Sequence, residues 1–248
     1  MATPSHGLNA VIVIPARLAS SRLPDKPLAD IGGLPMIVRV WQQAMEADIG
    51  PVVVACAEAE IADVITAAGG IAVLTDPDHE SGSDRIFEAL QAFDAAGQYD
   101  VVINLQGDLP LIDPEVIKTV VQPLADPEVD IATLAAEIVD EDEKHNPNVV
   151  KAIVDGDGET IAQAETFTRE TPTDDGPMWH HIGIYGYRRA ALARFVALPP
   201  SASERAARLE QLRALDDGMR IDVAFVDTVP FGVDTPADLE RARALVAL

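Results

Sequence analysis

Four short apolar runs, each separated from the next by a helical pattern or a polar loop, constrain the fold of this chain most strongly. The runs are residues 11–14, 52–56, 71–74 and 101–105. Each has the length of a buried strand, and none approaches the length that crosses a bilayer. Strands that alternate with helices predict a parallel, doubly wound α/β sheet. Ligands in such sheets bind beyond the carboxyl ends of the strands.

The segments between these runs carry helix signals. Residues 36–46 have apolar residues near helical spacing, and residues 59–68 are followed by a glycine pair, which commonly ends a helix. Ser81 or Ser83 is expected to cap a helix after the third run. The Asp-Pro pair at 113–114 predicts another helix start, with the aspartate as cap and the proline in the first turn.

The loop after the first apolar run is rich in cations. Arg17, Arg22 and Lys26 lie within ten residues, with Ser20 and Ser21 between them, in a chain that has only 18 lysines and arginines. Backbone N–H groups, hydroxyls and cations at a fixed strand end are what a polyphosphate needs. The sequence therefore predicts a polyphosphate site. The alternative is a solvated basic loop on the surface.

The charge balance narrows the choice of ligands. The chain has 41 acidic residues against 18 basic ones and a formal net charge of -23. This balance argues against nucleic acid and against an anionic membrane as partners. An anionic small substrate must therefore be held by a local cationic pocket or by a divalent metal ion.

Two features bear on the compartment. The single cysteine, Cys56, excludes an intramolecular disulfide and fits a reducing cytosol. It lies in an apolar run, so we expect a buried thiol rather than a nucleophile or a metal ligand. The first nine residues lack a cationic segment followed by an apolar one, so no signal peptide is expected.

The regular alternation changes in the second half of the chain. Residues 130–138 and 149–154 look like strands, and the Asp-Gly-Asp-Gly turn at 155–158 is expected to close a hairpin. Residues 166–178 look polar and irregular. We therefore expect one domain, residues 1–248, with an embedded β-rich insertion and no linker.

The C-terminal third adds four further expectations. Residues 181–187 show the alternating pattern of a strand, which places Ile182 and Ile184 on one face. The other face is shared by His181, Gly183, Tyr185 and Tyr187. Residues 221–226 look like a strand. The Thr-Pro-Ala-Asp sequence at 235–238 predicts a helix start. One more helix is expected from an apolar stripe formed by Leu209, Leu212 and Leu215.

Two aspartates follow strand-like or loop segments at places where a metal ion could bind. Asp108 comes after the fourth apolar run through a glycine, and Asp234 comes just before the last helix. Mg²⁺ prefers oxygen ligands and usually takes one or two from protein, with phosphate and water supplying the rest. The spacing alone favours a shared metal no more than it favours a turn aspartate and an extra helix cap.

Seven motifs, in order, resemble one known enzyme family. They are PARLASSRLPDKPL, DHESGSDR, NLQGDLPLI, NPNVVKAIV, HHIGIYGYR, LEQLR and GVDTPADLE. Each is weakly specific alone, but the ordered set closely resembles the 3-deoxy-manno-octulosonate cytidylyltransferases, also called CMP-Kdo synthetases. The resemblance extends from residue 11 to about residue 245.

The resemblance implies a fold, a reaction and a setting. The fold is a Rossmann-like nucleotide-diphospho-sugar transferase fold, three-layer α/β/α with a mostly parallel sheet and an insertion at about 130–190 for sugar binding and dimerisation. The reaction is CTP + Kdo → CMP-Kdo + pyrophosphate, for lipopolysaccharide biosynthesis. The family further implies Mg²⁺ dependence and a cytoplasmic homodimer.

The resemblance also assigns residues. The nucleotide side comprises Arg17, Ser20, Arg22, Lys26, His79, Ser81 and Gln106. The metal ligands are Asp108 and Asp234, which act in catalysis with Arg17 and Lys26. The sugar side comprises Gln106, Arg169, His181, Tyr185, Glu210 and Gln211. No general base is obvious, and His181 is a candidate for that role or for positioning.

Without the resemblance, the sugar-side residues have ordinary structural interpretations. Arg169 alone could be a surface charge, His181 a satisfied strand histidine and Tyr185 a packing residue. Two residues beside the leucine stripe, Glu210 and Gln211, could be solvated.

The chain departs from the family pattern at a few places. Asp25 stands where glycine is usual, Leu109 where glutamate is usual, and Asp76 where a basic or small residue is common. Residues 170–179 match poorly.

Two alternatives to Kdo activation remain open: a cytidylyltransferase for another 2-keto sugar acid, such as sialic acid or a Kdo analogue, or a nucleotide-binding protein without catalysis.

Overall fold

A computed structural model describes residues 8–20, 22–156, 160–172 and 176–247 of the 248. Ser21 of the cationic loop and part of the expected 155–158 turn lie outside the described residues. The strands in chain order are β1 (Ala10–Ala16), β2 (Asp30–Ile31), β3 (Leu34–Pro35), β4 (Val52–Cys56), β5 (Ile71–Leu74), β6 (Val101–Asn104), β7 (Ile131–Glu137), β8 (Lys151–Val154), β9 (Ile161–Thr168), β10 (Trp179–Arg188) and β11 (Ile221–Phe225).

Most of the helices lie where the caps and the apolar spacing predict them. They are η1 (Lys26–Leu28), α1 (Met36–Glu46), α2 (Ala59–Ala67), α3 (Gly82–Phe93), α4 (Pro114–Thr119), η2 (Gln122–Ala125), α5 (Glu141–Lys144), α6 (Arg189–Ala197), α7 (Ala202–Ala207), α8 (Leu212–Asp216) and α9 (Pro236–Val246). Among the described residues, no helix is long and apolar enough to cross a bilayer.

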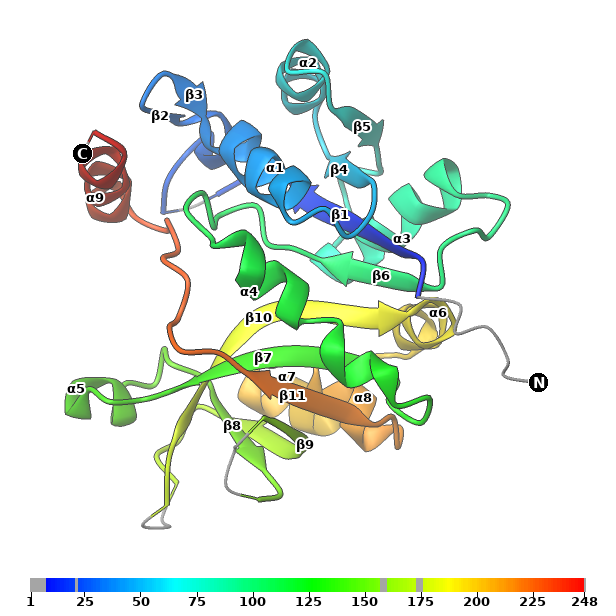
Figure 1. Cartoon of the computed structure of the whole chain (residues 1–248), viewed down its shortest axis with the longest axis vertical. Helices are drawn as coiled ribbons and strands as arrows, with labels where there is room; N and C mark the ends of the chain where they lie inside the picture. Colours follow the sequence, from blue (N-terminus) through cyan, green and yellow to red (C-terminus); the bar gives the residue numbers. More distant parts are fainter. Residues whose placement is uncertain (1–7, 21, 157–159, 173–175, 248) are drawn as a thin grey trace.

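Among the described residues, nine strands form one sheet in the order β5-β4-β1-β6-β10-β7-β11-β9-β8. The half made of β5, β4, β1 and β6 is parallel throughout, as the alternation of strands and helices predicts. The carboxyl ends of β1 and β6 therefore meet at one edge of the sheet. Figure 1 shows this half in blue to green at the top of the molecule.

The expectation of a mostly parallel sheet is wrong for the other half. β10 lies antiparallel to both of its neighbours β6 and β7, and β9 lies antiparallel to β8 and β11. Within the part of this half that the structure describes, only β7 and β11 pair in parallel. The cause is that the strands of the 130–190 region join the main sheet, with β10 inserted beside β6, instead of forming a sheet of their own.

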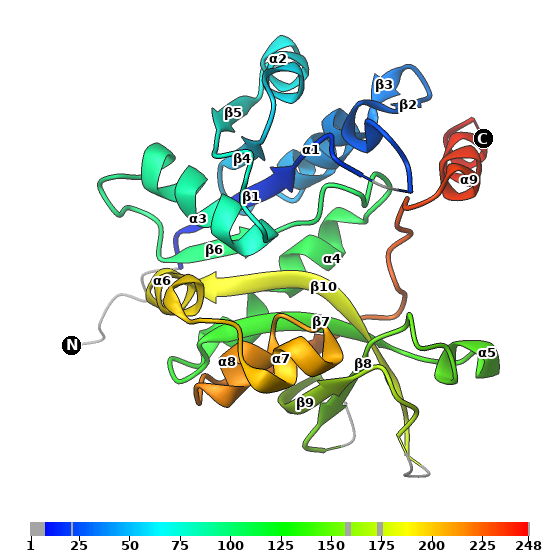
Figure 2. The ribbon, with the colours of Figure 1, turned by 180° about the vertical axis from the view of Figure 1, so that it is seen from behind.

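Helices cover both faces of the sheet. α1 and α4 lie on the face toward the viewer in Figure 1, and α3, α6, α7 and α8 lie on the opposite face, seen in Figure 2. Two separate sets of buried side chains correspond to these faces, one around Ile12 and Ile14 and one around Val11 and Val13. The alternation follows because successive strand residues point to opposite faces.

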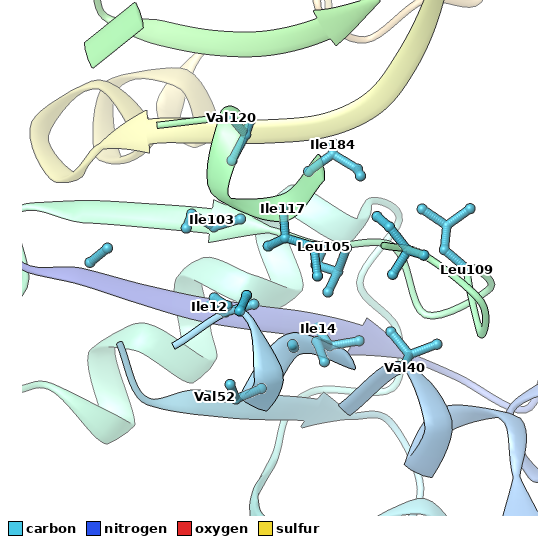
Figure 3. Packing of buried hydrophobic residues seen from close by; sticks show 14 of the residues in the cluster. Ile12, Ile14, Val40, Val52, Ile103, Leu105, Leu109, Ile117, Val120 and Ile184 are labelled. Carbon is cyan, nitrogen blue, oxygen red and sulfur yellow. The ribbon is translucent and has the colours of Figure 1, made fainter. Parts of the chain in front are cut away.

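The first of these cores packs strand residues against two helices. Ile12, Ile14 and Ile103 of the sheet belong to the same buried cluster as Val40 of α1 and Ile117 of α4 (Figure 3). Since every one of these side chains is fully buried, the core holds the ends of β1 and β6 in fixed positions. The loops that leave those strand ends therefore start from a rigid support.

Local signals predicted several boundaries correctly. Ser81, not Ser83, caps α3 by accepting from the Asp84 backbone N–H. Asp113 caps α4, and Thr235 with Asp238 forms a capping box at α9. Cys56 is buried as expected, and burial raises the pKa of its thiol to about 12.

Two further expectations are wrong. The leucine stripe does not lie on one helix, because the chain turns at Arg208, whose φ of 57° is left-handed, and separates α7 from α8. Leu209 and Leu212 are nevertheless buried. The region from residue 166 onward is not irregular at its start, since β9 continues to Thr168 and pairs with β8 as the predicted hairpin.

Candidate active site

A cavity of about 390 Å³ opens at the carboxyl ends of β1 and β6. Three chain segments supply most of its wall: the loop after β1, the loop between β5 and α3, and the turn after β6. Every nucleotide-side and metal residue that the sequence singled out lies on this wall, namely Arg17, Ser20, Arg22, Lys26, His79, Ser81, Gln106, Asp108 and Asp234. The parallel half of the sheet therefore brings them together at its carboxyl edge, where the rule for parallel sheets predicts a ligand site.

The cationic loop is fixed at both ends. The Leu18 backbone N–H donates to Glu58 at 2.9 Å, which anchors the loop start to the segment before α2. Lys26 begins the short helix η1, in which Pro27 occupies an early position that needs no N–H. Arg17, next to the first anchor, and Arg22, between the two anchors, are both exposed to solvent.

The turn after β6 passes close to β1 at Gly107. A Cβ at Gly107 would lie 3.0 Å from the Pro15 carbonyl oxygen and 3.2 Å from Ile37 Cδ1, closer than side chains usually pack, so glycine suits this approach. This approach places Asp108 beside the cationic loop. The Val233 backbone N–H donates to the Asp108 carbonyl oxygen at 2.9 Å, and so brings the segment that contains Asp234 to the same place.

Lys26 joins the two aspartates. Its Nζ lies 2.9 Å from Asp108 Oδ2 and 3.1 Å from Asp234 Oδ1. Arg22 contacts the other oxygen of Asp234 at 3.0 Å. Burial alone would lower the pKa of Lys26, but the two carboxylates outweigh that and hold its pKa above the usual value.

The contacts of Asp234 decide between its two interpretations. A helix cap would place its carboxylate on the first N–H groups of α9, yet Thr235 and Asp238 form that cap. The Asp234 carboxylate contacts Lys26 and Arg22 instead. Asp234 is therefore a member of the charge cluster and not an extra cap.

The donor set fits a hard divalent cation that a nucleotide brings with it. Two carboxylate oxygens already surround one cationic centre, the Lys26 ammonium, within 3.1 Å. Within the described residues there is no group of three or more His, Cys, Asp or Glu side chains that could hold a metal ion. Two carboxylates with phosphate and water completing the shell is the arrangement that Mg²⁺ prefers.

The loop after β5 forms the opposite wall and is held by α3. His79 Nε2 lies 2.5 Å from Glu88 Oε2, and the same oxygen accepts from the Asp76 backbone N–H at 2.9 Å. Arg85, one turn earlier on α3, lines the cavity and also contacts this loop. Sequence reasoning missed Arg85 as a site residue, although it stands in the DHESGSDR motif.

The sugar-side residues other than Gln106 do not line this cavity. His181 and Tyr185 lie on β10, Glu210 and Gln211 lie just before α8, and Arg169 lies just after β9. Two hydrogen bonds join this side to the turn after β6 and to the start of α3. Gln106 Nε2 donates to the Gly183 carbonyl oxygen at 3.0 Å, and Ser83 donates to Glu210 at 3.1 Å. The Gly183 carbonyl is available because the β7–β10 register shifts between Ile182 and Tyr185.

His181 is buried and already hydrogen-bonded. Its Nε2 lies 3.0 Å from Thr133 Oγ1, and that hydroxyl lies 2.9 Å from the Ile184 carbonyl oxygen. Because the hydroxyl donates its one hydrogen to a carbonyl, it accepts from His181, which places the ring proton on Nε2. Burial lowers the pKa of His181 to about 3, so the ring is neutral at pH 7.

The other four residues of this side divide into two groups. Tyr185 lies between the tilted rings of His181 and Tyr187, with ring centroids 5.5 Å and 5.8 Å away, and burial raises its pKa well above the usual value. Gln211 is buried, and burial raises the pKa of Glu210. Arg169 lies apart and donates to the backbone carbonyls of Ala207 and Pro147, both at 3.2 Å.

The three departures from the family pattern lie outside the cavity wall. Asp25 has a φ of 54°, the left-handed conformation that favours glycine. Leu109 is buried in the core beside Gly232. Asp76 is exposed and caps its own turn by accepting from the Asp78 backbone N–H.

Known proteins match this chain along almost its whole length. The family model described as "Cytidylyltransferase" matches residues 11–221. Enzymes named 3-deoxy-manno-octulosonate cytidylyltransferase from Rhodospirillum centenum and Paramagnetospirillum magneticum are 65% and 58% identical to it. Each alignment covers 96% of this chain, with 93% of the first relative and 98% of the second.

Solved structures agree with these matches. A CMP:2-keto-3-deoxy-manno-octonic acid synthetase complexed with CTP is 40% identical, with a TM-score of 0.88 over 96% of this chain and 98% of that one. A 4-diphosphocytidyl-2C-methyl-D-erythritol synthase from Anaerococcus prevotii shares the fold alone, at 16% identity, a TM-score of 0.64, and coverage of 97% and 99%. The chain belongs to the cytidylyltransferase family and, within it, to the 3-deoxy-manno-octulosonate cytidylyltransferases.

Proposed function

We propose that this protein activates Kdo by cytidylyl transfer, CTP + Kdo → CMP-Kdo + pyrophosphate, in lipopolysaccharide biosynthesis. The observation that carries the proposal is one cavity in which three cations, Arg17, Arg22 and Lys26, face two carboxylates, Asp108 and Asp234. A polyphosphate and its metal ion need these two kinds of group side by side. The enzyme names of the relatives supply the sugar.

The chemistry requires little covalent work from the protein. The anomeric hydroxyl of Kdo attacks the α-phosphorus of CTP, a new P–O bond forms, and the bond from the α-phosphorus to the bridging oxygen breaks as pyrophosphate leaves. The proton of the hydroxyl passes to the pyrophosphate or to water. Arg17, Arg22 and Lys26 neutralise the charge on the triphosphate and on the leaving pyrophosphate. Asp108 and Asp234 would hold Mg²⁺, which supplies positive charge at the reacting phosphate.

Lys26 has a different partner before the nucleotide binds. Its ammonium is held by the two carboxylates that would hold the metal ion. Two like charges at one place repel, so Lys26 must move from the carboxylates to the phosphates when the metal arrives with the nucleotide. We therefore propose that metal and nucleotide bind together, each favouring the other.

We propose that the sugar lies between the cavity and β10. Gln106 belongs to the cavity wall and also contacts Gly183 of β10, so it is placed between nucleotide and sugar. Arg169, His181, Tyr185, Glu210 and Gln211 are the residues proposed to bind Kdo. Because His181 is neutral and its Nε2 already donates to Thr133, we assign it positioning rather than proton transfer.

The reaction is tested by pyrophosphate release from CTP and Mg²⁺ with Kdo, with sialic acid, and with no sugar. Release with Kdo alone is expected. Release with sialic acid and not with Kdo would assign another 2-keto sugar acid, and no release with either sugar would leave a nucleotide-binding protein. Asp108→Asn serves as the control, since it should abolish release while the fold survives.

We also propose a cytoplasmic homodimer in which the 130–190 region contributes to sugar binding and dimerisation. The proposal rests on the family resemblance. Light scattering coupled to size-exclusion chromatography at micromolar protein is expected to give twice the chain mass of 26.4 kDa. A species of 26.4 kDa would contradict it.

A further inference from the structure

Arg85 is a buried arginine on the wall of the cavity that the reaction described above does not use. It is 2% exposed, lies in the first turns of α3 and lines the cavity. Among the described residues, no carboxylate lies within ion-pair distance of its guanidinium. The salt bridges found there all involve other arginines, lysines or histidines. A buried guanidinium without a carboxylate must be held by neutral acceptors.

The acceptors of Arg85 all belong to the segment that follows β5. Nη1 donates to Thr75 Oγ1 at 2.7 Å and to the Asp76 carbonyl oxygen at 3.0 Å, and Nη2 donates to the Pro77 carbonyl oxygen at 3.3 Å. Thr75 in turn donates its hydroxyl hydrogen to the carbonyl oxygen of Cys56, the last residue of β4, at 3.1 Å. Arg85 thus fixes the start of the loop against the sheet.

Glu88 holds the same loop from its donor side. One of its carboxylate oxygens contacts both the Asp76 backbone N–H and His79 Nε2. Arg85 and Glu88 are three residues apart on α3 and therefore share a face of the helix. Between them they bind the carbonyl oxygens and the N–H group of one short backbone segment, immediately before the cavity residues His79 and Ser81.

We propose that Arg85 is a positioning residue for nucleotide binding: it holds residues 75–77 so that His79 and Ser81 stay on the cavity wall. The proposal rests on the proposed function, because it assumes that CTP occupies this cavity with its nucleoside beside His79 and Ser81. It assigns to Arg85 a role on the nucleoside side. The triphosphate is left to Arg17, Arg22 and Lys26.

Calorimetry with two probes tests this, using CTP and inorganic tripolyphosphate, each with Mg²⁺ and without Kdo. For Arg85→Met we expect the Kd for CTP to rise by about tenfold or more, because His79 and Ser81 are no longer held on the cavity wall. The Kd for tripolyphosphate should stay within about threefold, because the phosphate cations are untouched. Equal losses for both probes would show that Arg85 acts through its charge and would overturn the proposal.

Arg85→Lys separates geometry from charge. It keeps the positive charge but offers one nitrogen in place of the two that reach separate acceptors, so CTP affinity should stay low. Recovery of wild-type CTP affinity in Arg85→Lys would contradict the positioning role. Glu88→Gln, at a partly exposed position, should weaken CTP binding in the same direction and covers the case in which Arg85→Met does not fold.

Arg188 provides a matched control. Like Arg85, it donates to neutral acceptors, here the backbone carbonyls of Val129, Leu124 and Asp126 at 2.7–2.8 Å, but it does not line the cavity. Arg188→Met should lower the melting temperature and leave both dissociation constants unchanged. If it weakens CTP binding as much as Arg85→Met does, the effect is general destabilisation. Wild-type protein that binds no CTP would count against the proposed function instead.

Discussion

The loop after β1 and the face of β10 both present polar residues that the family resemblance assigns to substrates, yet their states in the free protein differ. On the β1 side, Arg17 and Arg22 are exposed and Lys26 is held only by carboxylates that a ligand could replace. On the β10 side, His181 is buried against Thr133 and Tyr185 lies between two rings. We therefore expect the residues on the β1 side to exchange partners when a ligand binds, whereas the residues on the β10 side are already held by protein contacts.

This difference follows from where the residues stand on their elements. A residue in a loop beyond a strand end has no neighbouring strand to satisfy it, so its polar groups remain available. A residue inside a strand is packed on both sides before any ligand arrives. We therefore expect changes on the β1 side to act on catalysis, and changes on the β10 side to act on sugar binding and stability.

The largest expected effect is on the two carboxylates. Asp108→Asn and Asp234→Asn should each lower kcat by about three orders of magnitude, and the double variant should be little worse than the worse single one, because groups that act as a unit are non-additive. Kinetics at saturating CTP with Mg²⁺ titrated for each variant measure this.

The control for that cycle is Asp113→Asn. Asp113 caps α4 and lies outside the cavity wall. Its substitution removes the same charge as the two site substitutions, yet kcat should not change. Strictly additive losses in ln kcat, with a normal Mg²⁺ response in Asp234→Asn, would separate the roles of the two aspartates.

The next effect tests the sugar side. Arg169→Ala should raise the KM for Kdo by about 10- to 100-fold, the loss of one charge-assisted contact with the sugar carboxylate, and leave the Kd for CTP unchanged. Arg205→Ala is the control, since Arg205 is an exposed arginine that likewise donates to a carbonyl, that of Pro200. An equal loss of CTP affinity would move Arg169 to the nucleotide side.

His181 should make stability depend on pH. Its pKa is lowered to about 3 in the folded protein against 6.5 in the unfolded chain, so the unfolded state binds the proton first as the pH falls. The stability it contributes is complete above pH 6.5 and is lost as the pH falls toward 3, by about 2 kcal/mol between pH 7 and pH 5. Urea unfolding of wild type and His181→Gln at both pH values measures it; parallel pH dependences would contradict it.

The smallest effect concerns Asp25. Because a left-handed conformation costs a non-glycine residue about 1 kcal/mol, Asp25→Gly should raise the free energy of unfolding by somewhat less than that. Asp25 does not line the cavity, so the Kd for CTP should change less than about twofold. Asp48→Gly, at the other aspartate with positive φ, should give the same gain. A gain in CTP affinity confined to Asp25→Gly would show that the Asp25 carboxylate acts on the site.

The features that sequence reasoning predicted are those with local causes. Short apolar runs in the sequence predict the strands β1, β4, β5 and β6. The rule for parallel sheets then places Arg17 and Asp108 at one edge. The caps at Ser81 and Thr235 follow from their own side chains.

The features that sequence reasoning missed depend on distant partners. Lys26 contacts Asp108 and Asp234, which lie 82 and 208 positions away in the sequence. Sequence spacing cannot show that one ammonium lies between two carboxylates. The antiparallel place of β10 depends on pairing with both β6 and β7. The break at Arg208 has no glycine to signal it, and Arg85 reads as an ordinary helix residue until its buried contacts are seen.

The central claim is that Asp108 and Asp234 form one divalent-cation site that Lys26 closes in the free protein. The most direct measurement is Mn²⁺ binding without nucleotide, followed by electron paramagnetic resonance, for wild type, Lys26→Met and Arg17→Met. We expect Lys26→Met to bind Mn²⁺ about tenfold more tightly than wild type, since the competing charge is gone. Arg17→Met should match wild type, because its guanidinium makes no ion pair with either carboxylate. Equal Mn²⁺ affinity in wild type and Lys26→Met would contradict the claim.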